Sequence, residues 1–385
     1  MKKKDIWIIP QGYPDEYKSN LTPFIKNQII QLKNKGYRPI VLYIRLLPLK
    51  NLFVQKPREK KNVIENDGVH YTRNQRLIKG CSHINSIRYK EKLSTIVDEC
   101  LEEYGKPLCL MSHFSQYSGY AAASISEKYN IPLVNIEHAG WLLKDNIGKY
   151  ETKKLKFTYE KSKIFVCVSE ALRESIKEKI KATELDTKLR VIPNMIENRF
   201  VYYRIPQRKR FIFFSAGNLY PGKRFPMLIN AFSKAFSAQE NVSLVIAGDG
   251  KERRIIERLI KKNKREQQII LLGALTREEM LKQYILCNCF VLPSEHETFG
   301  IVYREALAIG RPVITTDHQG FKGNLWDERF GIRIPIDDCE ALVKSLIKMK
   351  NHSSDYNCEE ISQICREKYA ADNVINAYCD ILENL

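Results

Sequence analysis

The sequence predicts an α/β protein with two doubly wound parallel-sheet domains, and three observations support this. The chain has 385 residues, which is more than one ordinary core accommodates. Short continuous apolar runs alternate with longer amphipathic stretches, as expected when parallel strands buried on both faces alternate with covering helices. This alternation occurs twice, once on each side of a polar and basic segment at residues 198–210.

The expected strands are short runs rich in β-branched and other apolar residues. They lie at residues 6–9, 39–44, 108–112, 132–136, 164–169 and 189–192 in the first half, and at 211–216, 243–247, 269–272, 289–292 and 312–316 in the second. Amphipathic patterns such as 22–35 and 252–264 predict the helices between them. We therefore expect a series of βαβ units in each half.

The same pattern sets the expected domain boundaries. Residues 1–197 form an expected first domain, residues 198–210 a linker, and residues 211–368 an expected second domain. A helical pattern at 369–385 closes the chain and is expected to pack back toward the first domain. Ligands of open parallel sheets bind beyond the carboxyl ends of the strands, so we expect the two domains to face a central cleft.

Composition and cysteine spacing exclude several classes of protein. The chain is 44% hydrophobic and 28% charged, as is typical of globular proteins. It contains no apolar run long enough to cross a bilayer, and its first residues lack the long apolar region of a signal peptide, which predicts a cytoplasmic location. None of its ten cysteines forms a Cys-x-x-Cys pair, so we expect free thiols and no metal site.

The charge is strongly basic and concentrated in the first half. The net charge is +18, of which residues 1–200 contribute +14 through 36 basic and 22 acidic side chains. Nucleic acid, anionic membrane lipid and a phosphorylated acceptor all fit such a field, and a solvated basic face is the alternative. Aromatic residues interleaved with basic ones on a strand, which mark nucleic-acid binding, are not found. We therefore expect no nucleic-acid partner, and expect peripheral docking on an anionic inner membrane face.

The most informative stretch covers residues 291–315 and reads as strand, loop, helix, glycine stop and strand. Its loop carries Glu297, and the helix is expected to begin near Gly300, which places Glu305 about one and a half turns into it. A helix N-terminus can hold a pyrophosphate, and a glycine there lets the backbone approach it. Glu297 can then accept hydrogen bonds from sugar hydroxyls and Glu305 from ribose hydroxyls.

This stretch resembles the Glu-x7-Glu signature of retaining family 4 glycosyltransferases, which have the GT-B fold of two Rossmann-like domains. Their common form is Pro-Ser-x-x-Glu-Gly-Phe-Gly followed by a helix, and Thr298 stands here where glycine is usual. Further similar segments extend the resemblance over most of the chain, at residues 23–28, 165–170, 191–194, 214–224 and 244–250.

The resemblance implies a set of site residues. In that family the first domain binds the acceptor and the second the nucleotide-sugar donor, whose diphosphate contacts an Arg/Lys pair. Lys223 matches the lysine, and Asn218 occupies the place of the arginine. Arg224, next to Lys223, offers a further charge. The implied catalytic residues are His113, Lys223 and Glu297, the acceptor side includes Thr22 and His138, and the donor-binding residues are Gly217, Asn218, Lys223, Arg224, Glu297, Phe299, Gly300, Ile301 and Glu305. The histidines at 70, 83, 318 and 352 are expected at the surface.

The implied activity is retaining transfer of a sugar from a UDP- or GDP-linked donor to a saccharide or lipid-linked acceptor, as in capsule or lipopolysaccharide synthesis. The nucleotide sugar is a co-substrate, and neither a cofactor nor a metal ion is expected, since a helix N-terminus and basic side chains can replace a divalent ion. Three alternatives remain. They are an epimerase-like enzyme of the same fold, a catalytically weak subunit of a transferase complex, since Asn218 breaks the Arg/Lys pair, and a basic nucleic-acid-binding protein.

Overall fold

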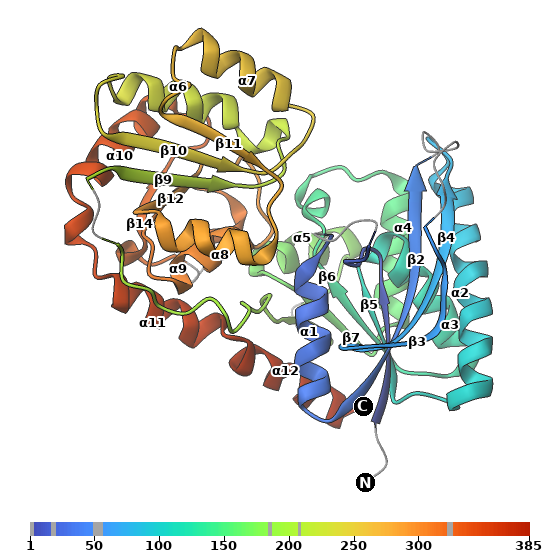
Figure 1. Cartoon of the computed structure of the whole chain (residues 1–385). Coiled ribbons are helices and arrows are strands. Elements are labelled where there is room, and N and C mark those ends of the chain that lie inside the picture. The colour runs from blue at the N-terminus through green and yellow to red at the C-terminus, as the bar shows by residue number, and fades with distance from the viewer. Residues whose placement is uncertain (1–3, 17–20, 49–56, 184–186, 207–208, 322–325) are drawn as a thin grey trace. The chain divides into compact units, whose positions relative to one another are not determined.

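The computed structural model divides the chain into two compact units (Figure 1). The first unit comprises Met1–Met195 together with Ala371–Leu385, and the second comprises Ile196–Ala370. The structure describes residues 4–385 except 17–20, 49–56, 184–186, 207–208 and 322–325. Each unit contains one sheet of its own, and the two are described separately.

The first unit is built on an eight-stranded sheet in the order β3-β4-β2-β1-β5-β6-β7-β8. All neighbouring strands are parallel except β3 and β4, which form an antiparallel pair at one edge. The strands are β1 (Lys4–Pro10), β2 (Tyr37–Pro48), β3 (Lys60–Glu65), β4 (Gly68–Leu77), β5 (Cys109–His113), β6 (Leu133–Glu137), β7 (Ile164–Cys167) and β8 (Leu189–Val191).

Helices cover both faces of this sheet. One face packs against α2 (Ser82–Tyr104) and α3 (Tyr120–Tyr129), whose apolar side chains form a single core with Trp7, Leu42 and Tyr71 of the strands. On the other face α1 (Pro23–Asn34) packs against β2 and against the last helix, α12 (Ala371–Glu383). The remaining helices are α4 (Lys149–Lys161) and α5 (Glu170–Ile180).

The second unit has a six-stranded, fully parallel sheet in the order β11-β10-β9-β12-β13-β14. Its strands are β9 (Phe211–Ala216), β10 (Val242–Ala247), β11 (Ile269–Gly273), β12 (Cys289–Leu292), β13 (Val313–Thr316) and β14 (Gly331–Ile334). Its helices are α6 (Phe225–Ala235), α7 (Arg253–Lys262), α8 (Arg277–Leu286), α9 (Ile301–Ala308), α10 (Cys339–Asn351) and α11 (Cys358–Tyr369). Counted from β9, this is the 3-2-1-4-5-6 order of doubly wound nucleotide-binding sheets.

The structure confirms the predicted fold class, and each predicted run overlaps a strand, with ends that differ by at most two residues where the run extends past it. Three strands were not predicted, namely β3, β4 and β14. The buried positions on the two faces of β4 include His70, Thr72 and Gln75, so this strand carries no apolar run to identify it. The backbone of Tyr203, within the segment expected as a linker, hydrogen-bonds to Ile309 and Arg311 of the second unit.

All ten cysteines are free thiols, and six of them are buried, namely Cys100, Cys109, Cys167, Cys287, Cys289 and Cys365. Within the described part of the chain, no helix combines the length and the apolar character that crossing a bilayer requires.

The loop after β10 gives a test of this fold. Gly248 has φ +136°, and a Cβ there would lie 1.9 Å from the carbonyl oxygen of Gly217, which begins the loop after β9. Gly248→Ala should therefore lower the stability of the second unit by about 1–3 kcal/mol, the usual cost of a strained backbone position. Calorimetry measures this, with Gly222→Ala as the matched control because no atom lies within 4 Å of its added Cβ. Equal melting temperatures for the two variants would contradict the packing of these loops.

Candidate functional site

Each sheet reverses its strand order once, and the predicted site residues follow the strands at these reversals. In the second unit the reversal lies between β9 and β12, whose following loops carry Lys223 and Glu297. In the first unit it lies between β1 and β5. Thr22 follows β1, and His113 is the last residue of β5, where it pairs with Pro10 at the end of β1. Ligands of open α/β sheets bind at such switch points, beyond the carboxyl ends of the strands.

An ion pair joins the two loops of the second unit. The Nζ of Lys223 donates to Oε1 of Glu297 at 2.5 Å, and their side chains are only 24% and 13% exposed. The backbone N–H of Glu295 donates to the carbonyl oxygen of Gly222 at 2.8 Å, which fixes the same loops to each other. A Cβ on Gly217 would lie 3.8 Å from the Lys223 stem. The structure thus brings together Gly217, Lys223 and Glu297.

The environment keeps Glu297 ionised. Burial favours a higher pKa, but the charge of the Lys223 ammonium and hydrogen bonds from Lys223 and Ser294 together bring the pKa of Glu297 below its usual value. The result is a carboxylate that can accept hydrogen bonds from hydroxyl groups at neutral pH. Because an ammonium has three N–H donors, Lys223 retains donors for a second anionic partner.

The helix N-terminus expected near Gly300 is present, since α9 begins at Ile301 with Gly300 as its N-cap. Gly300 has φ +75°, and a Cβ there would lie 2.8 Å from the Tyr303 ring and 3.1 Å from Nη1 of Arg304. The first-turn N–H groups of a helix have no partner inside it, so this end can bind an anion. The Phe299 ring is 3% exposed and packs against Tyr369, which leaves its backbone as the part able to meet a ligand.

Glu305 is held in one position before any ligand binds. It is 1% exposed, its Oε1 accepts from Nη2 of Arg277 at 2.5 Å, and its Oε2 accepts from the Tyr284 hydroxyl at 3.1 Å. Arg277 also donates to Glu197 at 2.7 Å. The sequence analysis did not select Arg277, although the capping box of Thr276 and Glu279 places it in the first turn of α8 and was readable.

Asn218 and Arg224, which lie in the same loop as Lys223, do not supply a second unpaired charge. Asn218 is exposed and carries no charge. Arg224 forms ion pairs with Glu295 at 2.8 Å and with Asp337 at 2.6 Å, so its guanidinium is already neutralised by two carboxylates. Lys223 is therefore the cation that this loop offers to an anionic ligand.

Two buried basic residues brace the loops and were not predicted. His318 is fully buried, with Nδ1 accepting from the Gly320 N–H at 3.1 Å and Nε2 lying 3.1 Å from the Thr315 hydroxyl. Burial lowers the pKa of His318 to about 4, so it is neutral. Arg304, also fully buried, stacks on Phe321 and donates to the Gly320 carbonyl at 2.6 Å.

The expectation that four histidines lie at the surface was half wrong. His83 and His352 are exposed, whereas His318 is fully buried and His70 is 2% exposed. His318 lies in a polar stretch that folds beneath the loop carrying Glu297, and His70 lies on the inward face of an unpredicted strand. Neither position shows in the local sequence pattern, because both depend on tertiary packing.

In the first unit the two predicted histidines contact each other. Nδ1 of His113 lies 3.0 Å from Nε2 of His138, and their rings stack with centroids 5.3 Å apart. The outer nitrogens, Nε2 of His113 and Nδ1 of His138, are buried and have no hydrogen-bond partner among the described residues. Burial lowers the pKa of His113 to about 3 and that of His138 well below its usual value, so both rings are neutral and one donates to the other.

A buried carboxylate holds this pair in place. Glu137 is fully buried, and it accepts the backbone N–H groups of His138 and Ala139 at 2.9 Å and that of Ser115 at 2.8 Å. These bonds tie the ends of β5 and β6 together. Burial raises the pKa of Glu137. The sequence analysis missed this residue, although its place at a strand end directly before His138 was visible.

The side chain of Thr22 hydrogen-bonds to the backbone of a neighbouring segment. It has φ +48°, precedes α1, and its hydroxyl donates to the carbonyl oxygen of Gly12 at 2.6 Å. The next aromatic residue, Phe24, has its ring centroid 4.8 Å from that of His138. The structure therefore brings the start of α1 against the histidine pair.

Metal-ligand geometry occurs in the described part of the chain at Glu65, Asp67 and His70, whose ligand atoms lie within 4.8 Å of one another. These groups already have partners, since Asp67 accepts from Tyr13 and from His70, and Glu65 pairs with Lys60. The cluster belongs to β3, β4 and their turn, and includes none of the predicted site residues.

The buried neutral histidines predict a fall in stability on mild acidification. A histidine whose folded pKa lies near 3 or 4 binds a proton only in the unfolded chain between that value and about pH 6.5, so each costs about 1.4 kcal/mol per pH unit in this window. The lowered pKa of Glu297 reduces the stability only below the usual pKa of a glutamate, which lies outside this pH range. Calorimetry between pH 7 and pH 5 should show falling melting temperatures, and His113→Gln should flatten the fall, whereas the exposed His83→Gln should not. A rise in melting temperature on acidification would contradict this.

Comparisons with known proteins agree with this geometry. The family described as "Glycosyl transferases group 1" matches residues 196–367, and "Glycosyltransferase Family 4" matches residues 25–199. An uncharacterized glycosyltransferase of Methanocaldococcus jannaschii is 26% identical over 297 residues, which are 76% of this chain and 77% of that protein. The alpha-monoglucosyldiacylglycerol synthase of Acholeplasma laidlawii is 30% identical over 125 residues, 32% of this chain and 31% of the relative.

Among solved structures, HepE of Anabaena in complex with UDP and glucose has the same fold, with a TM-score of 0.77 at 14% identity over the full length of both chains. The two family matches meet near residue 196, where the structure divides into its two units, and together they extend from residue 25 to residue 367. The chain is a glycosyltransferase of family 4, with two Rossmann-like domains of the GT-B type.

Proposed function

We propose that this glycosyltransferase is retaining and metal-independent, and moves a hexose-type sugar from a UDP- or GDP-linked donor to a saccharide or lipid-linked acceptor. The observation that carries the proposal is the ion pair of Lys223 and Glu297 beside the open N-terminus of α9. It puts a cation, an anion and a helix dipole at one switch point, and a nucleotide sugar has complementary groups for all three.

The departing diphosphate would be stabilised without a metal ion. The first-turn N–H groups of α9 and the ammonium of Lys223 would face the phosphate oxygens, where preorganised donors stabilise developing charge. Glu297, freed in part from Lys223, would accept hydrogen bonds from the sugar hydroxyls. The phosphate oxygen that leaves would take the proton of the incoming acceptor hydroxyl on the same face of the sugar.

The nucleoside would be positioned by Glu305. Arg277 and the Tyr284 hydroxyl hold its carboxylate, and each oxygen retains a lone pair for a ribose hydroxyl. In the first unit, the unpartnered Nε2 of the neutral His113 would hydrogen-bond a sugar hydroxyl, with His138 fixing its tautomer through their shared proton. A neutral imidazole suits this role, because either nitrogen can donate or accept.

The names of similar proteins indicate the class of donor and acceptor. The structure of HepE is described as a complex with UDP and glucose, which supports UDP as the first nucleotide to test. The Acholeplasma relative is named for a glycolipid product, which supports a lipid-linked acceptor. We propose a role in the synthesis of cell-surface polysaccharide, such as capsule or lipopolysaccharide, in the cytoplasm and at the inner face of the membrane.

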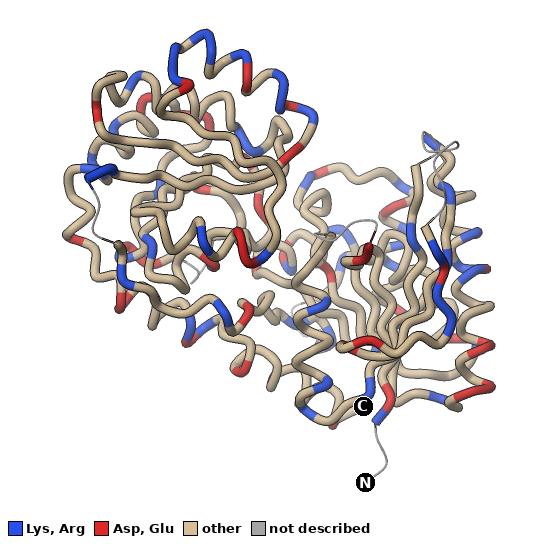
Figure 2. The backbone as a smooth tube through the Cα atoms, in the orientation of Figure 1, with Lys and Arg blue, Asp and Glu red and all other residues tan. Residues whose placement is uncertain are grey.

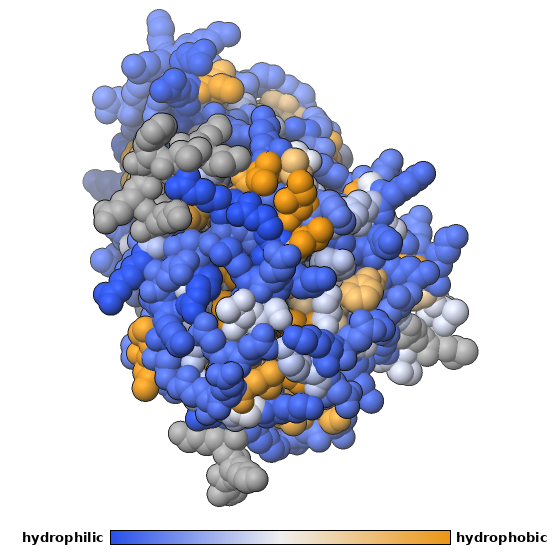
Figure 3. Space-filling model, turned by 90° about the vertical axis from the view of Figure 1, so that its right-hand side faces the viewer, coloured by the Kyte–Doolittle hydropathy of each residue, from blue (hydrophilic) through white to orange (hydrophobic). Residues whose placement is uncertain are grey.

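Membrane docking would depend on charge. Figure 2 shows Lys and Arg spread over both units with Asp and Glu among them. Figure 3, which views the side where β4 and α2 lie, shows hydrophobic side chains in small groups within a hydrophilic surface. The large apolar side chains exposed in the first unit are Val63, Ile64, Ile84 and Ile87. Basic residues near an anionic leaflet contribute about 1 kcal/mol each, so the proposed docking is sensitive to salt.

A second candidate function is supported by Asn218 and Arg224. The first lacks a charge and the second is paired with two carboxylates, which leaves Lys223, itself paired with Glu297, as the cation of this loop that can meet the diphosphate. A donor-binding subunit with slow turnover would fit this arrangement. Tight nucleotide binding without turnover of any donor would favour it.

The role of Lys223 can be tested without knowing the acceptor. Lys223→Met should lower the rate at which water replaces the acceptor and releases nucleotide from UDP-glucose or GDP-mannose by about 100- to 1,000-fold, the usual effect of removing one donor to a developing anion. Lys234→Met is the matched control, because this lysine pairs with Glu340 on the surface of α6. Equal rates for the two variants would refute the assignment of Lys223.

A further inference from the structure

A pocket of about 260 Å³ opens on the α1 face of the first unit. Its lining comes from the segment after β1, from α1 and from strands β2, β3 and β4, and it includes none of the predicted acceptor residues Thr22, His113 and His138. Tyr43 of β2 and Thr72 of β4 are register partners, so their side chains lie side by side on its floor. Pockets for drug-sized ligands occupy about 300–1,000 Å³, so this one suits a single small ring.

The floor of the pocket carries polar groups without partners. Tyr43 is 3% exposed and Thr72 is 2% exposed, yet neither hydroxyl makes a hydrogen bond to any described residue. Lys26 of α1, also in the lining, has no ion pair within the described part of the chain. Burial and the nearby Asp15 raise the pKa of Tyr43, so its hydroxyl remains a donor. The hydroxyls of Tyr43 and Thr72 and the ammonium of the half-buried Lys26 are therefore available in this pocket to hydrogen-bond water or a polar ligand.

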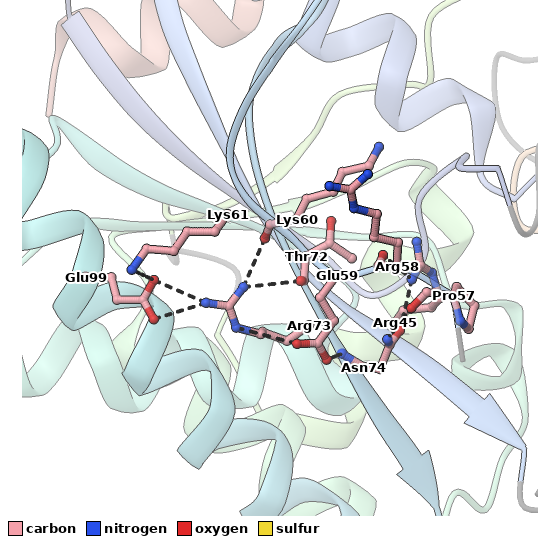
Figure 4. Close-up of polar contacts among 10 residues, drawn as sticks. All are labelled: Arg45, Pro57, Arg58, Glu59, Lys60, Lys61, Thr72, Arg73, Asn74 and Glu99. Atoms are coloured by element: carbon pink, nitrogen blue, oxygen red, sulfur yellow. Dashed lines mark hydrogen bonds and ion pairs between the residues drawn. The ribbon is translucent and has the colours of Figure 1, made fainter. Parts of the chain in front are cut away.

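The walls of the pocket are fixed by a network at the sheet edge (Figure 4). Arg45, with a 2% exposed side chain, donates to Asp15 of the lining at 2.6 Å and to Asn74 at 2.9 Å. Asn74 in turn donates to the Pro57 carbonyl at 2.7 Å. Next to it, Arg73 donates to the Lys60 carbonyl at 2.9 Å and to Glu99 at 3.0 Å. The segment after β1, the start of β3 and the strand β4 are thereby held around a preformed space.

The charges of the lining select against an anion and against a metal ion. Two of its carboxylates are already paired, Asp15 with Arg45 and Glu65 with Lys60. The lining has no excess of positive charge to attract a phosphate, since its charged residues are Lys26, Lys60, Asp15, Glu16 and Glu65. The ammonium groups also oppose a cation at Glu65. What remains is a set of hydroxyl, amine and carboxylate groups with aromatic edges, which matches an uncharged ligand rich in hydroxyls.

We propose that this pocket binds one uncharged sugar ring of the acceptor, a ring other than the one that receives the new bond. The assignment to the acceptor rests on the proposed function, whereas binding of a sugar ring to the pocket does not. The hydroxyls of Tyr43 and Thr72 and the ammonium of Lys26 bind the ring hydroxyls, and the Tyr13 ring borders the site. The pocket then selects acceptors by a sugar at some distance from the reacting hydroxyl.

Saturation-transfer NMR on the full chain tests this with methyl glycosides of glucose, galactose, mannose and N-acetylglucosamine, without nucleotide. At least one glycoside should bind, and Tyr43→Phe and Thr72→Val should each raise its Kd about fivefold, the effect of one lost hydrogen bond of about 1 kcal/mol. Both substitutions keep the shape of the side chain, and unchanged melting temperatures verify the fold. Tyr129→Phe is the control, because the hydroxyl of Tyr129, the last residue of α3, donates to Asp98 of α2 outside the pocket.

Three outcomes would overturn the proposal. They are the absence of any glycoside signal, a signal that Tyr43→Phe and Thr72→Val leave unchanged, and displacement of the glycoside by inorganic phosphate, which would indicate an anion site. A separate measurement of nucleotide binding distinguishes failure of the proposed function. If UDP and the other nucleotides do not bind, but both variants weaken glycoside binding as expected, the sugar site is supported and the donor assignment is refuted.

Discussion

The ion pair between Lys223 and Glu297 joins the loops that follow β9 and β12, the two strands between which the second sheet reverses its order. Parallel strands on either side of such a reversal send their helices to opposite faces, so a ligand can enter between the loops. An ammonium and a carboxylate held at this point can each turn to a ligand of opposite charge. The rest of the proposed donor site depends on the fixed positions of these two loops.

Several buried groups maintain those positions. Arg304 and His318 bind the loop after β13 beneath Glu297, and neither can reach solvent. Arg277 and Tyr284 fix Glu305 before a nucleotide arrives. In the first unit, Glu137 plays a comparable part, since it ties the strand ends that carry His113 and His138. The charged groups expected to meet the ligand are therefore preorganised, which lowers the cost of binding.

The sequence was sufficient for the architecture and for the loops of the site. Continuous apolar runs identified the strands buried on both faces, and the segment from Glu297 to the helix after Gly300 predicted the proposed donor site. The supporting residues could not be predicted in the same way. Arg304 lies one residue before Glu305 on an apolar helix, and its burial depends on Phe321, which follows the next strand. Strand β4 has polar residues at buried positions, so its pattern does not resemble a strand of a doubly wound sheet.

The central claim is that a nucleoside diphosphate binds the second unit without a metal ion. Differential scanning fluorimetry with UDP, GDP and ADP, each with and without EDTA, tests it most directly. At a hundred times its Kd a ligand stabilises the folded state by about 2.7 kcal/mol, so one nucleotide should raise the melting temperature by several degrees. The account predicts that EDTA leaves this shift unchanged and that Glu305→Gln reduces it. A shift that disappears with EDTA, or no shift with any of the three, would contradict it.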